Sequence, residues 1–369
     1  MSAKFTKYKL LVITFLILIV FPAGECFCSD IYSKAKVIKI ENVEPGKNVS
    51  TQNTWLRIIV GKYNGRVVEV KNYLWNDKHY NTYPKINGTV VVKIHEGPGA
   101  DPEYVSIYGY SRDKLLLSLI LVFFAVVFLV CGKKGFRVSF SILVNILLFW
   151  QVLIPMIKGG HNPLFSCALV AFISASVMLS LILGFNKKYL SALFCVTVGI
   201  LFSGFVTVIF IKWADISGAF IDGSRMLLTA TRTMDGWHIT DFRGMAAGGV
   251  IIASLGTVID VVIDIVAGMY SVRNAVAGIT RKELFSSGTE IGRDVLGGML
   301  GSLLLVFAAM SLVSLILYSA LHIPFLRVTN WEFFTVTLLE TFISSMSFVV
   351  SIPVAVAVTS LSLSTKSNV

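Results

Sequence analysis

Seven long apolar runs dominate this sequence and limit what it can fold into. Each run holds roughly 20 residues, the number that an α-helix needs to cross a hydrocarbon layer about 30 Å thick. The runs lie at residues 114–131, 136–157, 163–184, 189–211, 245–269, 295–321 and 333–361. We therefore predict a mainly α fold, a polytopic transmembrane helix bundle, over residues 113–369.

The composition agrees with a membrane environment. Only 14% of the 369 residues are charged, whereas soluble proteins carry about 25%, and the mean hydropathy is +0.77. The net charge of +11 comes from Lys and Arg residues in the N-terminal third and in short connections between the apolar runs. That distribution favours a topology signal over nucleic-acid binding, so we predict the lipid bilayer as a partner and no nucleic acid.

The N-terminus has the pattern of a secretory signal. Lys4, Lys7 and Lys9 precede an apolar run at residues 10–22, which is short for a span and typical of a signal h-region. No clear cleavage site of small residues follows it. We therefore predict that residues 1–29 form either a signal peptide or a retained N-terminal anchor.

Residues 30–112 have a strand-forming composition and are predicted to form a small β domain. Five short runs at 34–43, 54–62, 66–74, 89–95 and 104–110 suggest a barrel of the OB or SH3 kind. Asn64-Gly65 predicts a type I′ hairpin, which needs positive φ at both central residues. Aromatic residues could pack within the domain or bind a partner: Trp55, Tyr63, Tyr73, Trp75, Tyr80 and Tyr83.

Basic residues predict the orientation of the bundle. They follow the first, third and fifth apolar runs: Lys133, Lys134, Arg137, Lys187, Lys188, Arg273, Arg281 and Lys282. Because cytoplasmic loops are enriched in Lys and Arg, we expect a multi-pass protein of the cell membrane. Its β domain is predicted to be extracytoplasmic and its C-terminus cytoplasmic.

The longest polar connection covers residues 212–244 and contains a predicted short helix around 224–231. It carries His238, Asp241 and Arg243, together with Trp237. Tryptophan is common at the membrane surface, so we interpret this connection as a surface segment between two spans.

The fifth run contains two carboxylates. Asp260 and Asp264 are four residues apart and therefore share one helical face, with Thr257 one turn earlier. A carboxylate in the middle of a bilayer costs roughly 2.5–3.5 kcal/mol on insertion scales, so such residues mark candidate functional sites. Glu340 in the last run is either a second acid that could couple ion movement to transport or a partner of Arg327.

The start of the sixth helix is well marked. Thr280 and Glu283 form a capping box, which predicts a helix that begins at Arg281. A helix from there to Leu321 is too long for one span, so we expect a bend near Gly288 or Gly292.

A bend there exposes further charged residues at the inner mouth of the bundle: Glu290, Arg293 and Asp294. We expect four carboxylates and an arginine to gather near the inner leaflet. Such a cluster could couple proton movement to a conformational change, hold a cation through oxygen ligands, or latch the fifth and sixth spans together. It contains no histidine, and five scattered cysteines suggest no disulfide framework, so we predict neither a metal site nor a cofactor.

Glycine spacing marks close helix packing. Gly244 with Gly248, and Gly297 with Gly301, follow the GxxxG pattern that lets helix backbones approach. We expect the fifth and sixth spans to form the tightly packed centre of the bundle. Further copies of the chain are possible partners, in a homo-oligomer.

Several motifs resemble those of the YibE/F-like family of bacterial multi-pass membrane proteins. They are Asp241-Phe242-Arg243-Gly244, Gly256 to Asp260, Arg281-Lys282-Glu283-Leu284-Phe285 and Ile291-Gly292-Arg293-Asp294. The sequence differs at 297–302, where the family tends to have Gly-Thr-Met-Thr-Asn-Thr, and at Asp264, where a small hydroxyl residue is expected. The resemblance implies a membrane protein with a suspected role in transport and no established substrate.

These features favour a transporter or permease for a small solute or ion, coupled through intramembrane carboxylates. The alternative is a non-transporting scaffold or sensor whose outer β domain binds a partner. The sequence contains no G-x-S-x-G, H-E-x-x-H or Walker A motif, so we do not expect an enzyme, and ATP-driven work would need another subunit.

Overall fold

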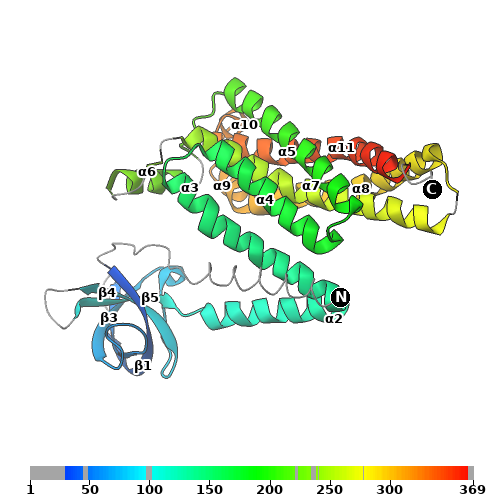
Figure 1. Cartoon of the computed structure of the whole chain (residues 1–369). Coiled ribbons are helices and arrows are strands. Elements are labelled where there is room, and N and C mark those ends of the chain that lie inside the picture. The colour runs from blue at the N-terminus through cyan, green and yellow to red at the C-terminus, as the bar shows by residue number, and fades with distance from the viewer. Residues whose placement is uncertain are drawn as a thin grey trace. The chain divides into compact units, whose positions relative to one another are not determined.

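A computed structural model describes residues 30–44, 49–96, 102–220, 223–233, 238–239, 241–276 and 278–364. The predicted signal segment at 1–29 lies outside these residues. The chain divides into two compact units, Met1–Val126 and Val127–Val369, which are described separately (Figure 1).

The first unit contains a five-stranded antiparallel sheet. The strands are β1 (Asp30–Glu44), β2 (Val49–Ile58), β3 (Val67–Trp75), β4 (Thr89–Glu96) and β5 (Pro102–Tyr110), with a 3₁₀ turn η1 (Lys78–Tyr80). Their order in the sheet is β3-β2-β1-β4-β5, and the edge strands β3 and β5 contact each other. The sheet is therefore nearly closed, and the long β1, which pairs with both β2 and β4, gives it the connectivity of an OB-type barrel.

Alternating side chains fill the inside of this barrel, as the period of two along a strand requires. The buried residues are Ala35, Val37, Leu56, Ile58, Tyr63, Val70, Val90, Val92 and Ile94. The expected hairpin joins β2 to β3, but the predicted turn type is wrong. The connection runs from residue 59 to 66, and only Gly65 of the Asn64-Gly65 pair has a positive φ, 87°.

The described residues after β5 are mainly helical. They are α2 (Asp113–Leu148), the π-helical η2 (Phe149–Leu153), α3 (Ile154–Lys158), α4 (Pro163–Leu183), α5 (Lys187–Trp213), α6 (Ser224–Thr233), α7 (Phe242–Ala275), α8 (Arg281–Met310), α9 (Leu312–Ala320), α10 (Phe325–Thr329) and α11 (Glu332–Ser364). Gly132 interrupts α2 with a non-helical backbone, φ 54° and ψ −132°. This break separates the first two predicted spans.

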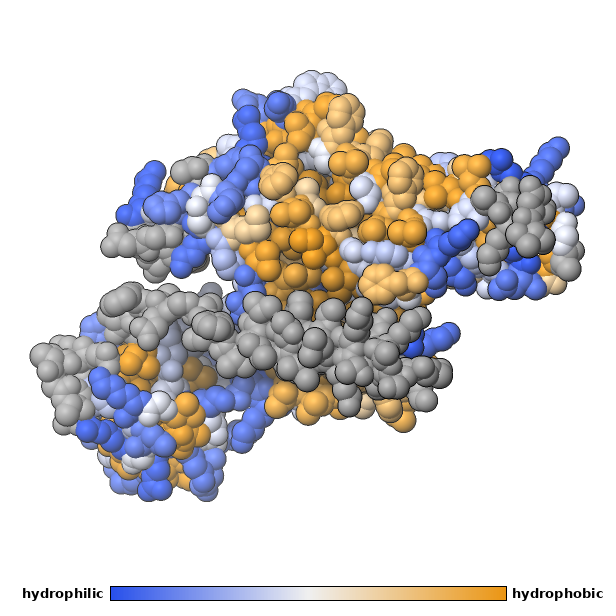
Figure 2. Space-filling model, in the orientation of Figure 1, coloured by the Kyte–Doolittle hydropathy of each residue, from blue (hydrophilic) through white to orange (hydrophobic). Residues whose placement is uncertain are grey.

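Seven helical segments in the described part of the chain are long and apolar enough to cross a membrane. They match the seven predicted runs, with one shift. The sixth segment is Arg281–Met310, and its helix ends at Ser311. Figure 2 shows apolar residues over the middle of the helical unit and hydrophilic residues toward its two ends. That distribution suits a bilayer, whose core is apolar and whose two surfaces are polar.

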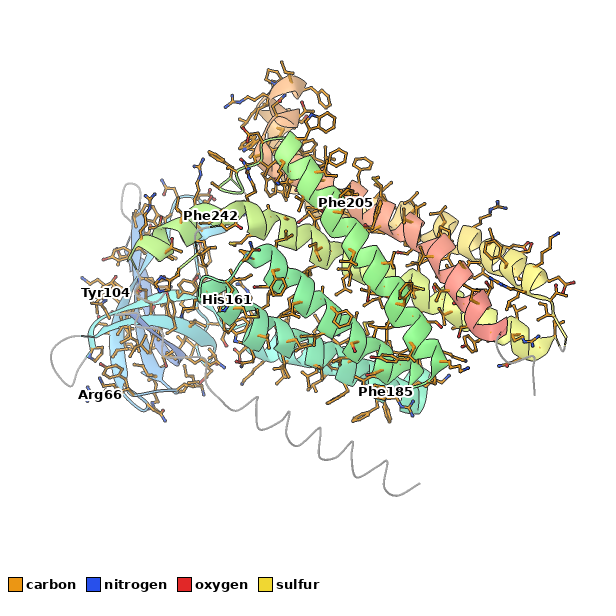
Figure 3. The ribbon with its side chains drawn as sticks, turned by 45° about the horizontal axis from the view of Figure 1, so that its top comes forward. Arg66, Tyr104, His161, Phe185, Phe205 and Phe242 are labelled. Atoms are coloured by element: carbon orange, nitrogen blue, oxygen red, sulfur yellow. The ribbon has the colours of Figure 1, made fainter. Side chains whose placement is uncertain are left out.

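Helix α7 lies at the centre of the second unit. It packs against α4, α5, α8 and α11, and its buried side chains join theirs in one core that includes Ile200, Val258, Ile265 and Phe348. In Figure 3, His161 and Phe242 lie at one end of these helices and Phe185 lies at the other. The central position of α7 brings its polar residues into contact with α5 and α11.

Candidate functional site

One side of α7 combines small residues with carboxylates. Gly249, Ala253, Gly256, Asp260 and Asp264 are spaced by four, three, four and four residues, which places them on one helical face. We call this set the acidic face of α7. Its first two residues are half-buried and its last three are exposed in this single chain. The sequence-based prediction that the two aspartates share a face is confirmed.

A third carboxylate from α11 meets this face. A Cβ atom added to Gly249 would lie 3.2 Å from Oε1 of Glu340, so the glutamate carboxylate rests against the glycine. Glu340, Asp260 and Asp264 make no hydrogen bond or ion pair within the described residues. The predicted pair of Glu340 with Arg327 is therefore not formed.

A chain of buried hydroxyl groups joins three helices beside the acidic face. Ser203 of α5 donates a hydrogen bond of 2.7 Å to Oγ of Ser254 in α7, and Ser254 lies 3.1 Å from Oγ of Ser344 in α11. All three serines are fully buried. We call Ser203, Ser254 and Ser344 the serine seam.

Thr257 connects the serine seam to the acidic face. Its Oγ1 donates to the carbonyl of Ser254 at 2.9 Å and lies 3.5 Å from the carbonyl of Ser344. Asp260 follows one turn later on the same side of α7. Polar groups therefore continue from the interior of the bundle toward the Asp260 carboxylate.

The charged residues of α8 do not join this arrangement as expected. Glu290, Arg293 and Asp294 are all exposed, and no ion pair between α7 and α8 occurs in the described part of the chain. The described residues also contain no group of three acidic, His or Cys side chains that could hold a metal ion. Within the described residues Arg293 therefore pairs with neither Glu290 nor Asp264, the two partners considered for it.

Glycine packing, rather than charge, holds α7 and α8 together. A Cβ added to Gly268 would lie 3.1 Å from Cδ1 of Ile291, and one added to Gly288 would lie 2.7 Å from Sδ of Met269. Helix α8 runs from Arg281 to Met310, so the predicted bend at Gly288 or Gly292 is wrong. Gly288 and Gly292 are both buried because α8 packs closely against its neighbouring helices there.

A small polar pocket lies at the end of the bundle where α4 and α7 begin. Its lining includes His161, His238 and Asp241. The Asp241 carboxylate caps α7 by accepting a hydrogen bond of 2.7 Å from the backbone N–H of Gly244, and the backbone N–H of His238 donates to Lys158 O. No sequence spacing relates His161 to His238, so only the fold brings them together.

The fold and these polar groups define a class. Seven helices of sufficient length and apolarity, with carboxylates and hydroxyls along the central helix, indicate a multi-pass membrane protein. The family model described as YibE/F-like protein matches residues 119–365, so the chain belongs to the YibE/F-like family. No curated protein and no solved structure matches it significantly.

Proposed function

We propose that this protein is a membrane transporter or permease for a small solute or ion, with the acidic face of α7 along its path. The observation that carries the proposal is the set of three carboxylates, Asp260, Asp264 and Glu340, on or against one membrane-level face. Unpaired carboxylates inside a membrane cost free energy. Binding of a cation or exchange of protons during transport would explain why the protein has them.

The serine seam supports the same proposal. Hydroxyl groups both donate and accept hydrogen bonds, so Ser254 and Thr257 can solvate a cation or pass a proton between Glu340 and Asp260. The alternative, that these charges only hold the fifth and sixth spans together, loses support because no ion pair joins α7 to α8 within the described residues. Proton or sodium coupling remains as the use of these acids.

The proposed orientation follows from charge. Lys187 and Lys188 begin α5, and Arg273, Arg281 and Lys282 surround the connection from α7 to α8. We assign this end to the cytoplasm because cytoplasmic loops are rich in Lys and Arg. The pocket with His161 and His238 then opens on the extracytoplasmic side, together with the β domain.

The test is flux into proteoliposomes under an imposed proton or sodium gradient, screened over ions and small metabolites. Asp260→Asn keeps the size of the side chain and removes its charge, so we expect it to abolish coupled flux while the folded protein stays in the membrane. Asp215→Asn is the control, because Asp215 lies in a loop with 93% of its side chain exposed and only a surface ion pair with Arg243, 3.1 Å long. Equal flux from wild type and Asp260→Asn would remove the central claim.

The second candidate is a non-transporting scaffold or sensor that works through the β domain. Exposed aromatic side chains on that domain favour it, including Tyr73, Trp75, Tyr80 and Tyr108. Deletion of residues 30–110 would then abolish function while the helical unit remains folded. A transporter whose path lies along α7 should instead keep measurable flux after the same deletion.

A further inference from the structure

The β domain has a surface pocket where β3 ends. Its described lining consists of Trp75, Asn76, Asp77 and Tyr80. The two aromatic side chains are 58% and 82% exposed, so the rings are open to a ligand. The surface of the pocket is mainly apolar, and Asn76 and Asp77 add the polar groups of its described lining.

The pocket is held in a fixed conformation by its neighbours. The Asn81 side chain accepts a hydrogen bond from the Trp75 backbone N–H and donates one to the Trp75 carbonyl, each 2.6 Å long. It also donates to the Tyr83 hydroxyl at 3.1 Å. The Asn81 side chain thus satisfies the Trp75 N–H and C=O groups that no neighbouring strand pairs with at this edge of the sheet. These hydrogen bonds hold the backbone at the exposed Trp75.

Several other aromatic residues of this domain have partners inside it. Tyr32 and Tyr108 stack edge to face with centroids 5.1 Å apart, and Lys39 lies 4.7 Å above the Trp55 ring. The Trp75 and Tyr80 rings make no ring or cation contact with the described residues. Internal contacts therefore account for the first group but not for Trp75 and Tyr80. Tyr73 and Tyr104 are also exposed without a ring or cation partner among the described residues, but they do not line the pocket.

The polar groups of the pocket narrow the ligand chemistry. One oxygen of Asp77 accepts a hydrogen bond from the His79 backbone N–H at 3.1 Å, and the other can accept from a hydroxyl group. Asn76 can both donate and accept. None of the described lining residues is cationic, and the Asp77 carboxylate repels phosphate, which disfavours nucleic acids and anionic lipid headgroups.

We propose that this pocket binds a saccharide. The apolar C–H face of a pyranose ring stacks on Trp75 or Tyr80, and the ring hydroxyls donate to Asp77 and exchange hydrogen bonds with Asn76. The open shape of the site fits one or two units of a longer glycan chain. This proposal does not depend on transport activity, because the pocket lies wholly within the first unit.

The experiment uses the full chain in lipid nanodiscs. Soluble hexasaccharides of β-1,4-linked glucose, β-1,4-linked N-acetylglucosamine, α-1,4-linked glucose and α-1,6-linked mannose are titrated to millimolar concentration, with calorimetry as the readout. We expect saturable binding of at least one. Trp75→Ala and Tyr80→Ala should each weaken it about tenfold, because each removes a stacking surface and part of the pocket wall.

Tyr104→Ala is the matched control. Tyr104, labelled in Figure 3, is 55% exposed on β5. It is not among the residues that line the pocket, so this variant should bind the saccharide as wild type does. Circular dichroism melts check that every variant is folded. Failure of all four saccharides to bind, or equal binding by Trp75→Ala and wild type, overturns the proposal.

A membrane anchor is the competing role, since Trp and Tyr often lie at bilayer surfaces. Nanodiscs with brominated lipids test it. The fluorescence of Trp75 is the difference between the emission of wild type and that of Trp75→Phe. If brominated lipids quench this difference, the Trp75 ring lies in the bilayer and the saccharide proposal is overturned. If they do not quench it, the proposal is supported.

Discussion

At the scale of single residues, the centre of the helical unit depends on close contacts that few other side chains allow. Gly199 of α5 lies where α5, α7 and α11 meet, and a Cβ added there would be 2.7 Å from both Ser351 Oγ and a methyl group of Val258. Ser351 is almost fully buried and Val258 fully, so neither can move into free space. The glycine is therefore required by its neighbours.

Gly199→Ala should accordingly destabilise the bundle. We expect a loss of about 1–3 kcal/mol in the free energy of unfolding, the usual cost of overpacking a filled core. Denaturant titration in detergent micelles measures it. Gly204→Ala on the same helix is the control, since its nearest contact would be an ordinary 3.4 Å to Ile251 Cδ1; equal stabilities of the two variants would contradict the prediction.

The serine seam permits a second prediction at this scale. Ser254→Ala removes the acceptor for Ser203 and the neighbour of Ser344, and interhelical hydrogen bonds in membrane proteins contribute on average about 0.6 and at most about 1.7 kcal/mol. We expect a destabilisation of about 1–2 kcal/mol. In a double-mutant cycle with Ser203→Ala the two effects should couple, and strict additivity would argue against the hydrogen bond.

At the scale of elements, α8 begins as its sequence predicts. The Thr280 side chain accepts a hydrogen bond from the Glu283 backbone N–H, and the Glu283 carboxylate accepts one from the Thr280 backbone N–H at 2.8 Å. Leu284 is buried in the same core that Ile279 packs against. The capping box and the adjoining apolar contact fix where the helix starts after the tight connection from α7.

Thr280→Ala should loosen this helix start. Loss of an N-cap side chain costs about 1 kcal/mol. The amide hydrogens of Glu283 and Leu284, which are hydrogen-bonded to Thr280, should therefore exchange several-fold faster, as measured by mass spectrometry. Thr280→Ser retains the accepting hydroxyl and should exchange at the wild-type rate. If both variants exchange alike, the cap does not control the start of α8.

At the scale of the whole molecule, the proposed orientation can be tested by cysteine labelling in intact cells. In a background without native cysteines, Asn64→Cys in the β domain should react with a membrane-impermeant maleimide. Lys187→Cys, at the start of α5, should react only after the membrane is permeabilised, because we assign that end to the cytoplasm. The reverse pattern would invert the proposed topology and place the pocket at His161 and His238 on the cytoplasmic side.

The sequence by itself determined the elements of this protein. Apolar runs of about twenty residues predicted seven spans, the strand-forming composition of residues 30–112 predicted five strands, and Thr280 with Glu283 predicted the start of α8. These features depend on neighbours within a few residues, and local spacing records them. The type I′ turn failed because the β2–β3 connection is eight residues long, from 59 to 66.

The tertiary structure alone decided which polar groups meet. Ser254 lies 51 residues from Ser203 and 90 from Ser344, and Glu340 meets Gly249 from a different helix. Apolar residues can face lipid or protein equally well, so hydropathy does not show which helix faces pack together. For the same reason the acids of α8 were expected beside Asp264, whereas glycine packing between α7 and α8 leaves them on an exposed side.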